Sequence, residues 1–273
     1  MMKTLDLTSA DGTSLRGCLW EPDGEVVFDL VLVHGLGEHI ARYDTMATQL
    51  NTRGIRVRGV DFRGHGKSGG KQGFVEQWSD YHEDIEAVAR DVPGPFALYG
   101  HSMGSIVALD WLRHHEDRVF AAGISGSPIE VAAPVPAWKT GAAGLLSKLW
   151  PSLQMDNELD SAMLATDPAV AESYDKDPLV HSWATPRWLT EFNGARARIK
   201  EHAARYATPL LATWGSEDPI ISGPALQAFV DSWKAPTLAL PRAGMRHEVH
   251  NEPEHPAYTT EIADWFMARH EEG

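Results

Sequence analysis

Hydrophobic and polar positions in the first half of the chain follow a repeating strand, helix, strand pattern. Strand-like segments occupy residues 3–8, 14–20, 26–33, 55–60, 96–99 and 119–124. Helical periodicity marks residues 43–53, 79–90 and 103–114. The segment 26–33 is apolar almost throughout, which indicates a strand buried on both faces of a sheet. This alternation predicts an α/β fold with a mostly parallel sheet flanked by helices.

The pattern changes after residue 127. From Pro128 to about Tyr206, prolines and helix-compatible stretches are frequent and no strand is evident, so residues 128–206 are expected to form an inserted helical cap. The earlier pattern then returns in strand-like segments at 209–214 and 237–240 and in expected helices at 224–233 and 256–270. We therefore predict one core with an eight-stranded sheet, built from residues 1–127 and 207–273.

Composition and charge narrow the classes of function. The 273 residues are 43% hydrophobic and 23% charged, which is ordinary for a folded domain. With 24 Lys and Arg against 38 Asp and Glu, the formal net charge is -14, so no nucleic-acid partner is expected. The same negative charge disfavours steady attachment to anionic lipids, and at most a transient contact with a lipid interface through the cap is expected.

Cysteine content and the N-terminal sequence bear on the compartment. Cys18 is the single cysteine, so the chain forms neither an intrachain disulfide nor a zinc site with several thiolates. Residues 1–12 include Lys3, Asp6 and Asp11 and lack the apolar stretch of an export signal. No segment approaches the apolar length that a membrane span needs. A cytoplasmic location is expected.

The strongest chemical signal is the pentapeptide Gly100-His101-Ser102-Met103-Gly104, which lies between an expected strand and an expected helix. It fits the Gly-x-Ser-x-Gly nucleophile elbow, in which the serine occupies a sharp strand-to-helix turn. Glycines at the first and last positions are needed because a Cβ there would crowd the neighbouring strand or helix. We therefore predict that Ser102 is a nucleophile.

A serine hydroxyl becomes a good nucleophile only when a base removes its proton and an acid holds that base in the right tautomer. In folds with this elbow the chain order is serine, acid, histidine, and the last two lie in loops after late strands. Asp218 occupies such a loop and is the predicted acid. Glu217 is an alternative, but Pro219 suits a tight turn that fixes residue 218 and favours Asp218.

The predicted base is His247, in the loop after the last expected strand. This loop and the loop of Asp218 both lie at the carboxyl edge of the sheet, where open α/β sheets bind their ligands. His250 and His255 are alternatives further along the chain. His255 directly precedes Pro256 at the expected start of the last helix, so we interpret it as a helix-entry residue.

The tetrahedral intermediate of acyl transfer needs hydrogen-bond donors for its oxyanion. One predicted donor is the backbone N–H of Met103, at the positive end of the helix that follows the serine. The other comes from the loop after the third expected strand, where His34-Gly35-Leu36-Gly37 has the form that assigns the N–H of Leu36 as a donor. His34 itself is interpreted as a loop histidine that is hydrogen-bonded to the backbone.

Three further patterns, in two segments of the chain, imitate cofactor or metal sites. Residues 64–69 match Gly-x-Gly-x-x-Gly, but no helix is expected before about Ser79, so no helix N-terminus faces a pyrophosphate. The same segment imitates a P-loop, yet Asp61 stands where that motif requires glycine. His247 and His250 are three residues apart, whereas the zinc motif His-Glu-x-x-His separates its histidines by four. We expect neither a cofactor nor a metal.

The motifs together resemble a known family. They comprise His34-Gly35-Leu36-Gly37-Glu38-His39 with Arg42-Tyr43, the segment 61–68, the elbow at 100–104, the cap segment 177–181, and His247-Glu248 with Asn251-Glu252. Over nearly the whole chain they are similar to the monoacylglycerol lipase and lysophospholipase group of α/β-hydrolases. The resemblance implies the α/β-hydrolase fold with an inserted cap. It departs from the family at Ser105, where a second glycine is usual.

This resemblance also implies roles for individual residues. It assigns a catalytic triad to Ser102, Asp218 and His247, and it assigns the oxyanion donors to the backbone of Leu36 and Met103. No cofactor belongs to this chemistry, and the partner that it implies is a small acyl ester.

The activity predicted on these grounds is that of a serine carboxylic-ester hydrolase, with monoacylglycerols as the expected substrates. Glu38 and Arg42 are, by the resemblance, a polar pair near the glycerol end of the site. An apolar tunnel for the acyl chain is expected over the serine. The cap has enough apolar residues to line one, and they are Leu145, Leu146, Leu149, Trp150, Leu153, Met155, Leu159, Met163 and Leu164. Each of them alone is better explained by packing of the cap onto the core, so none is assigned as a binding residue. Lysophospholipase or short-chain carboxylesterase activity would use the same triad, as would thioesterase, acyltransferase or peptidase activity. A non-catalytic binding module is the remaining alternative.

Overall fold

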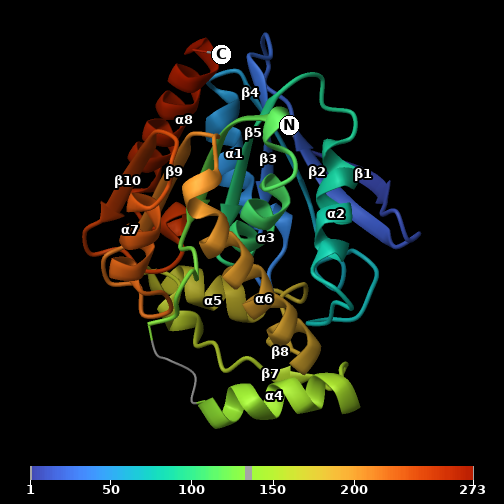
Figure 1. Ribbon diagram of the computed structural model, residues 1–273. Coiled ribbons are helices and arrows are strands. Elements are labelled where there is room, and N and C mark those ends of the chain that lie inside the picture. The colour runs from blue at the N-terminus through green and yellow to red at the C-terminus, as the bar shows by residue number, and fades with distance from the viewer. Residues whose placement is uncertain (1, 133–136, 273) are drawn as a thin grey trace.

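The computed structural model describes residues 2–132 and 137–272, with an eight-stranded sheet through its centre (Figure 1). The strand order is β1-β2-β4-β3-β5-β6-β9-β10. β1 pairs antiparallel with β2, and β2 pairs antiparallel with β4, whereas the other neighbours are parallel. The strands are β1 Met2–Thr8, β2 Ser14–Trp20, β3 Phe28–Val33, β4 Ile55–Val60, β5 Phe96–His101, β6 Val119–Ser125, β9 Leu210–Gly215 and β10 Thr237–Arg242. The prediction of a mostly parallel eight-stranded sheet is confirmed.

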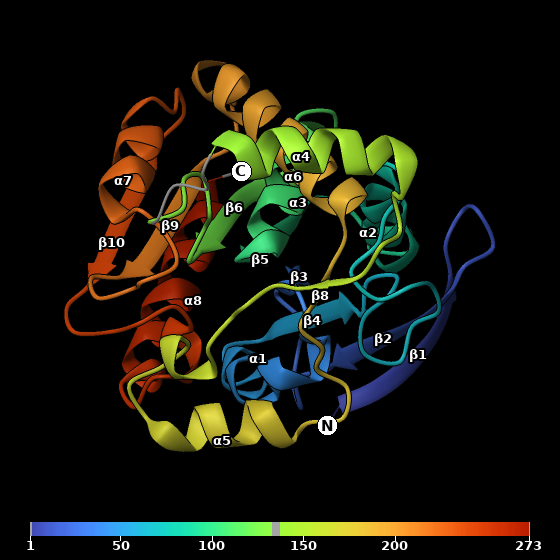
Figure 2. The ribbon, with the colours of Figure 1, turned by 90° about the horizontal axis from the view of Figure 1, so that it is seen from below.

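Helices cover both faces of this sheet (Figure 2). The α-helices are α1 Asp44–Asn51, α2 Ser79–Ala89, α3 Met103–Leu112, α4 Ala137–Leu149, α5 Pro168–Lys176, α6 Pro186–His202, α7 Gly223–Asp231 and α8 His255–Glu272. Short 3-10 helices are η1 Ile40–Tyr43, η2 Glu116–Arg118, η3 Ser161–Met163, η4 Ala203–Arg205 and η5 Val249–Asn251. α1 and α8 pack on one face, and α2, α3, α6 and α7 pack on the other.

The central strand β3 shows why the core divides in two. Successive side chains of a strand point to opposite faces of the sheet. Val31 and Val33 join the cluster under α2, α3, α6 and α7, whereas Leu30 and Leu32 join the cluster under α1 and α8. All six residues of β3 are buried, as its apolar sequence predicts.

The segment between β6 and β9 lies beyond the carboxyl ends of the parallel strands, at the bottom of Figure 1. It contains α4, α5 and α6. The expectation that it contains no strand is wrong, because β7 Met155–Asp156 pairs antiparallel with β8 Trp183–Ala184. Two-residue strands are too short to show the alternation by which strands are recognised. Some of the expected cap residues, 133–136, lie outside the described residues.

α6 ties this segment to the core. The helix begins in a favourable way, because the Thr185 side chain accepts a hydrogen bond from the Trp188 N–H and Pro186 occupies the first turn. Further along, Ile199 belongs to the core cluster that includes α3 residues. The Arg198 guanidinium also forms an ion pair of 2.6 Å with a buried aspartate of α3. The last half of α6 is therefore part of the core packing. None of the described helices has both the length and the apolar character needed to cross a membrane.

Candidate active site

Ser102 follows directly on β5 and immediately precedes α3. Its φ of 49° and ψ of -126° place it in a strained conformation that a non-glycine residue rarely adopts. Added Cβ atoms on Gly100 and Gly104 would lie 2.6 Å and 2.4 Å from backbone oxygens, so both glycines are sterically required. The Ser102 N–H donates to the Ser125 carbonyl at 2.9 Å, which fixes the turn against β6. This geometry is that of the predicted nucleophile elbow.

The imidazole of His247 lies between the predicted nucleophile and the predicted acid. Its Nε2 is 2.9 Å from Ser102 Oγ, and its Nδ1 is 2.7 Å from Asp218 Oδ2. Gly126 packs against this ring, because an added Cβ there would lie 3.1 Å from two ring atoms. The structure thus brings together three residues from the loops after β5, β9 and β10.

Electrostatics around this imidazole favour its role as a base. Burial alone would lower the pKa of His247, but the Asp218 carboxylate and, more weakly, Glu248 and Glu38 raise it above its usual value. Asp218 is held by its own loop, since Oδ1 accepts the Ile220 N–H at 2.8 Å. An acid fixed in this way keeps the proton on Nδ1 and leaves Nε2 free to accept a proton from the serine.

The alternative residues lie elsewhere. The side chain of Glu217 is exposed, and it is the Asp218 carboxylate that contacts the imidazole. His250 is buried and stacks on Tyr43 with ring centroids 4.6 Å apart. Burial lowers the pKa of His250 to about 3, which keeps its ring neutral. His255 begins α8, as interpreted from the sequence.

The two predicted oxyanion donors belong to the first residue of α3 and to the loop after β3. Met103 is the first residue of α3, so its N–H is one of the helix-terminal donors without an intrahelical acceptor. Leu36 lies in the loop after β3, and both residues line the cavity over the serine. The next residue, Gly37, has a φ of 78° and its carbonyl accepts the His181 N–H at 2.8 Å. The cap thereby contacts the loop that carries the Leu36 donor.

Two residues near the elbow also have defined local roles. The ring of His34 bonds to backbone through both nitrogens, Nδ1 to the Gly35 carbonyl at 2.7 Å and Nε2 to the Phe62 N–H at 3.0 Å. The hydroxyl of Ser105, which departs from the resemblance, donates to the Ser102 carbonyl and accepts from the Ser127 hydroxyl, at 2.6 Å each. The Ser105 hydroxyl therefore stabilises the backbone of the elbow and has no hydrogen bond to the side chains of the predicted triad.

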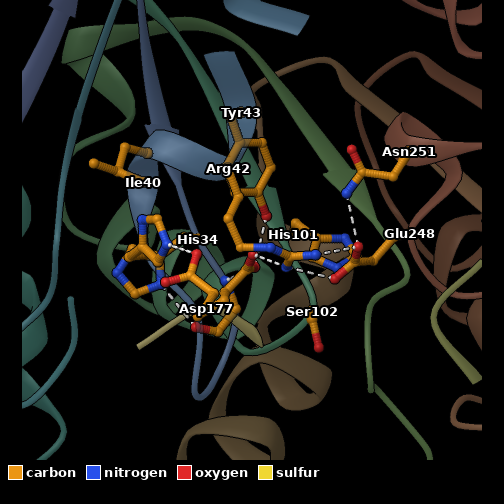
Figure 3. Close-up of polar contacts among 12 residues, drawn as sticks. His34, Ile40, Arg42, Tyr43, His101, Ser102, Asp177, Glu248 and Asn251 are labelled. Atoms are coloured by element: carbon orange, nitrogen blue, oxygen red, sulfur yellow. Dashed lines mark hydrogen bonds and ion pairs between the residues drawn. The ribbon is translucent and has the colours of Figure 1, made fainter. Parts of the chain in front are cut away.

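A charged cluster lies beside the site (Figure 3). The Arg42 guanidinium donates to Glu38 at 2.6 Å and, through both of its terminal nitrogens, to Glu248 at 2.7 Å. Glu38 and Glu248 line the cavity, but Arg42 is not among its lining residues and its side chain is 10% exposed. The resemblance implies that Glu38 and Arg42 bind glycerol together. Of the two, only Glu38 lies in the cavity wall, because the Arg42 guanidinium is bonded to two carboxylates.

A cavity of about 370 Å³ lies over Ser102. Its apolar wall comes largely from the cap and the loop after β9, including Trp188, Leu189, Phe192 and Ile220. Of the apolar cap residues named from the sequence, Met155, Leu159 and Leu164 line it. Leu145, Leu149, Trp150 and Leu153 are instead exposed on the surface of the cap.

The sequence is similar to known hydrolases over most of its length. The sequence model of the family described as serine aminopeptidase, S33, matches residues 24–254. The chain belongs to this family. It is 30% identical to the monoacylglycerol lipase of Mycolicibacterium smegmatis, over 92% of this chain and 91% of that protein. It is also 32% identical to an abhydrolase domain-containing protein of Dictyostelium discoideum, over 97% of this chain but only 29% of that protein's length.

Solved structures give the same assignment for this S33-family chain. The monoacylglycerol lipase of Paleococcus ferrophilus is 25% identical, with a TM-score of 0.87 over 93% of this chain and 99% of that one. The α/β-hydrolase fold and the resemblance to the monoacylglycerol lipase group are thereby confirmed. The chain is a hydrolase of the α/β-hydrolase superfamily.

The glycine-rich loop at residues 64–69 packs against the Asp61 carboxylate, which binds backbone N–H groups. Asp61 accepts the N–H groups of Ile40 and Lys67, both at 2.8 Å, and an added Cβ on Gly66 would lie 2.2 Å from that carboxylate. α2 begins at Ser79, well after the loop. Within residues 2–132 and 137–272, no group of three or more His, Cys, Asp or Glu residues is placed to hold a metal ion.

The sequence reasoning missed two features of the site. Glu248 was noted only as part of a motif, although it lines the cavity and binds Arg42. The aromatic wall of Trp188 and Phe192 was also not predicted, although these residues lie four apart on α6 and therefore on one helix face. That spacing was the signal available in the sequence.

Proposed function

We propose that this protein is a monoacylglycerol lipase that uses Ser102, His247 and Asp218 as a catalytic triad. The observation that carries the proposal is the position of the His247 ring, 2.9 Å from the serine hydroxyl and 2.7 Å from the aspartate, at the floor of an apolar cavity. The relative from Mycolicibacterium smegmatis, which bears the name monoacylglycerol lipase, supports the choice of substrate.

The reaction begins when His247 Nε2 takes the proton of Ser102 and Oγ attacks the ester carbonyl carbon. The backbone N–H groups of Leu36 and Met103 donate to the oxyanion of the tetrahedral intermediate. The C–O bond to glycerol then breaks, and the imidazolium returns its proton to the departing oxygen. Water repeats these steps on the acyl-enzyme, so that a fatty acid leaves and the serine regains its proton.

The cavity wall supports a long-chain, uncharged substrate. Each methylene that leaves water contributes about 0.8 kcal/mol, and the lining is mainly apolar. The acidic lining residues are Glu38, Asp156 and Glu248, and no lining residue within the described ranges is Lys or Arg. The phosphate of a lysophospholipid would face these carboxylates and would find no lining cation to pair with. Glycerol hydroxyls, in contrast, can donate hydrogen bonds to carboxylates. We place the glycerol end beside Glu38.

The cap is proposed to touch a lipid interface transiently. The exposed large hydrophobic residues of the described chain are concentrated there, and they comprise Leu145, Leu149, Trp150, Leu153, Met155 and Trp183. α4 lies at the outer edge of the molecule in Figure 1. Aromatic and aliphatic side chains on a cap over the active site would bring the cavity to the surface that holds the substrate. We propose residues 128–206 as this cap.

A substrate panel tests the proposed function. Initial rates are compared for a long-chain monoacylglycerol, the lysophosphatidylcholine with the same acyl chain, a short p-nitrophenyl ester and an amino-acyl p-nitroanilide. We expect the largest kcat/KM for the monoacylglycerol and loss of all ester turnover in Ser102→Ala. A preference for the lysophospholipid or for the anilide would assign the protein to lysophospholipases or peptidases instead.

A further inference from the structure

A bridge of four side chains, Glu38, Arg42, Glu248 and Asn251, joins the segment after β3 to the segment after β10. Figure 3 shows the Arg42 side chain reaching the Glu248 carboxylate, with Asn251 on the far side of that carboxylate. Arg42 Nη1 and Nη2 donate to the two oxygens of Glu248 at 2.7 Å each, and Asn251 Nδ2 donates to Oε2 at 2.7 Å. Arg42 Nη1 also donates to Glu38 Oε2 at 2.6 Å. Glu248 directly follows the proposed base His247.

The other oxygen of Glu38 holds the loop that precedes the Leu36 donor. Oε1 accepts the Gly35 N–H at 2.6 Å and the Tyr43 hydroxyl at 2.8 Å. Gly35 lies so close to the elbow that an added Cβ would be 3.2 Å from Ser102 Cβ. A rotation of the Glu38 carboxylate would therefore release the Gly35 N–H and move the backbone that carries Leu36.

The bridge is charged and shielded from water. The side chains of Glu38 and Glu248 are each 3% exposed, so breaking one contact leaves a buried charge without a partner. Burial would raise the pKa of Glu248, but the charge and hydrogen bonds of Arg42 lower it to about 2, so the carboxylate is ionised near neutral pH. The Arg42 guanidinium also lies over the Tyr174 ring at 4.8 Å, which fixes it from the cap side.

We propose that Glu248 and Arg42 are positioning residues, which hold Glu38 and through it set the loop at 35–37 so that the Leu36 N–H faces the oxyanion. This rests on the proposed function. Neither residue need touch the substrate in this role. Arg42 in particular acts through Glu38 rather than on the glycerol head group, because both of its terminal nitrogens bond to the two carboxylates and the residue does not line the cavity.

Steady-state kinetics with two substrates separate positioning from head-group binding. Glu248→Gln keeps the shape and removes the charge, and Arg42→Lys keeps the charge but loses the two-pronged contact. Each variant is assayed on a monoacylglycerol and on the methyl ester of the same fatty acid. We expect kcat to fall about 10- to 100-fold on both esters, because a displaced donor loses transition-state stabilisation. KM should change little.

The matched control is Asp29→Asn. Asp29 is buried and also has a two-pronged contact with an arginine, since Arg56 Nε and Nη2 donate to its two oxygens at 2.7 Å each. It lies in β3 near the amino ends of the parallel strands, away from the site. This variant should lose stability in thermal denaturation while its kcat on both esters stays within about twofold of wild type.

A pH profile gives a readout that general destabilisation would not move. The groups that face His247 are the carboxylates of Asp218, Glu248 and Glu38 and the neutral ring of His101 at 4.9 Å, and Arg42 is the counter-charge of Glu248 and Glu38. Glu248 raises the pKa of His247. Removing its charge in Glu248→Gln should therefore move the acid limb of kcat/KM to lower pH, and Asp29→Asn should leave that limb in place.

Three results would overturn the proposal. A rise in KM for the monoacylglycerol alone would make the cluster a head-group site. Equal kcat losses in Glu248→Gln and Asp29→Asn would make the effect a general loss of stability. Wild-type kcat in both Glu248→Gln and Arg42→Lys would show that the loop is set without the bridge. Failure of the proposed function is distinct from these, since the wild-type protein would then hydrolyse neither ester.

Discussion

Replacing Asp218 by asparagine tests the proposed catalytic role of His247, because it exchanges only one carboxylate oxygen for an NH₂ group. Asp218 Oδ1 accepts the N–H groups of Ile220 at 2.8 Å and Ile221 at 3.3 Å, and Oδ2 faces His247 Nδ1 at 2.7 Å. The carboxamide oxygen of asparagine must occupy the Oδ1 position, because an NH₂ group there would meet two N–H donors. Its NH₂ group then donates to Nδ1 and forces the imidazole proton onto Nε2. In that tautomer the ring has no acceptor for the proton of Ser102.

The expected loss of kcat is about 10⁴-fold, which corresponds to about 5.5 kcal/mol of transition-state stabilisation. The substitution also removes the negative charge that raises the pKa of His247, so the acid limb of kcat/KM should move to lower pH. The assay is fatty-acid release over a range of pH, at saturating monoacylglycerol for kcat and at concentrations below KM for kcat/KM, with circular dichroism to show that the fold is retained.

The control is Glu217→Gln, which alters the adjacent exposed carboxylate and should leave kcat within about twofold of wild type. A loss of less than about tenfold in Asp218→Asn would refute the tautomer argument. A large loss in Glu217→Gln instead would transfer the role of the acid to that residue.

Three further predictions concern the loop, the cap and acid stability. Gly37→Ala should cost about 1–3 kcal/mol and lower kcat, because its φ is 78° and its Cβ would lie 2.3 Å from the His181 carbonyl. Gly12 also has a positive φ, but nothing lies within 4 Å of an added Cβ. Gly12→Ala should therefore lower stability in urea denaturation and leave kcat unchanged. Trp150→Asp, at a site 61% exposed, should lower turnover of vesicle-borne monoacylglycerol but not of a short soluble ester. The same change relative to wild type on both substrates would contradict the interface proposal. Glu248 stabilises the fold above pH 4.5, and this contribution is lost as pH falls toward about 2. The melting temperature of Glu248→Gln should therefore depend less on pH over that range than that of wild type. The same pH dependence in both proteins would count against the ion pair.

The fold was predictable where one strand or helix carries its own signal. β2 and β4 have the predicted bounds, and the apolar run of β3 was correctly interpreted as a strand buried on both faces. The elbow around Ser102 was also visible, because its steric demands select particular residues over five consecutive positions. β7 and β8 were missed because each depends on its partner rather than on its own two residues.

The site was less predictable where it depends on contacts between distant segments. The chain order narrowed the triad, but only the structure shows His247 between residues that lie 145 and 29 positions away. Arg42 was expected at the glycerol end, yet Glu248, 206 positions further along, occupies its guanidinium. Apolar composition alone likewise did not distinguish cap residues that line the cavity from those such as Trp150 that face solvent.

Labelling with a fluorophosphonate tests the central claim most directly. The phosphonate bonds to a serine oxygen whose proton an adjacent base has removed, so it reports whether Ser102 is activated by His247. The account predicts one phosphonate per chain, mapped by peptide mass to residues 100–104, no labelling in Ser102→Ala, and labelling at least about 10³-fold slower in His247→Ala. Rapid labelling of Ser102→Ala, or of His247→Ala at the wild-type rate, would contradict it.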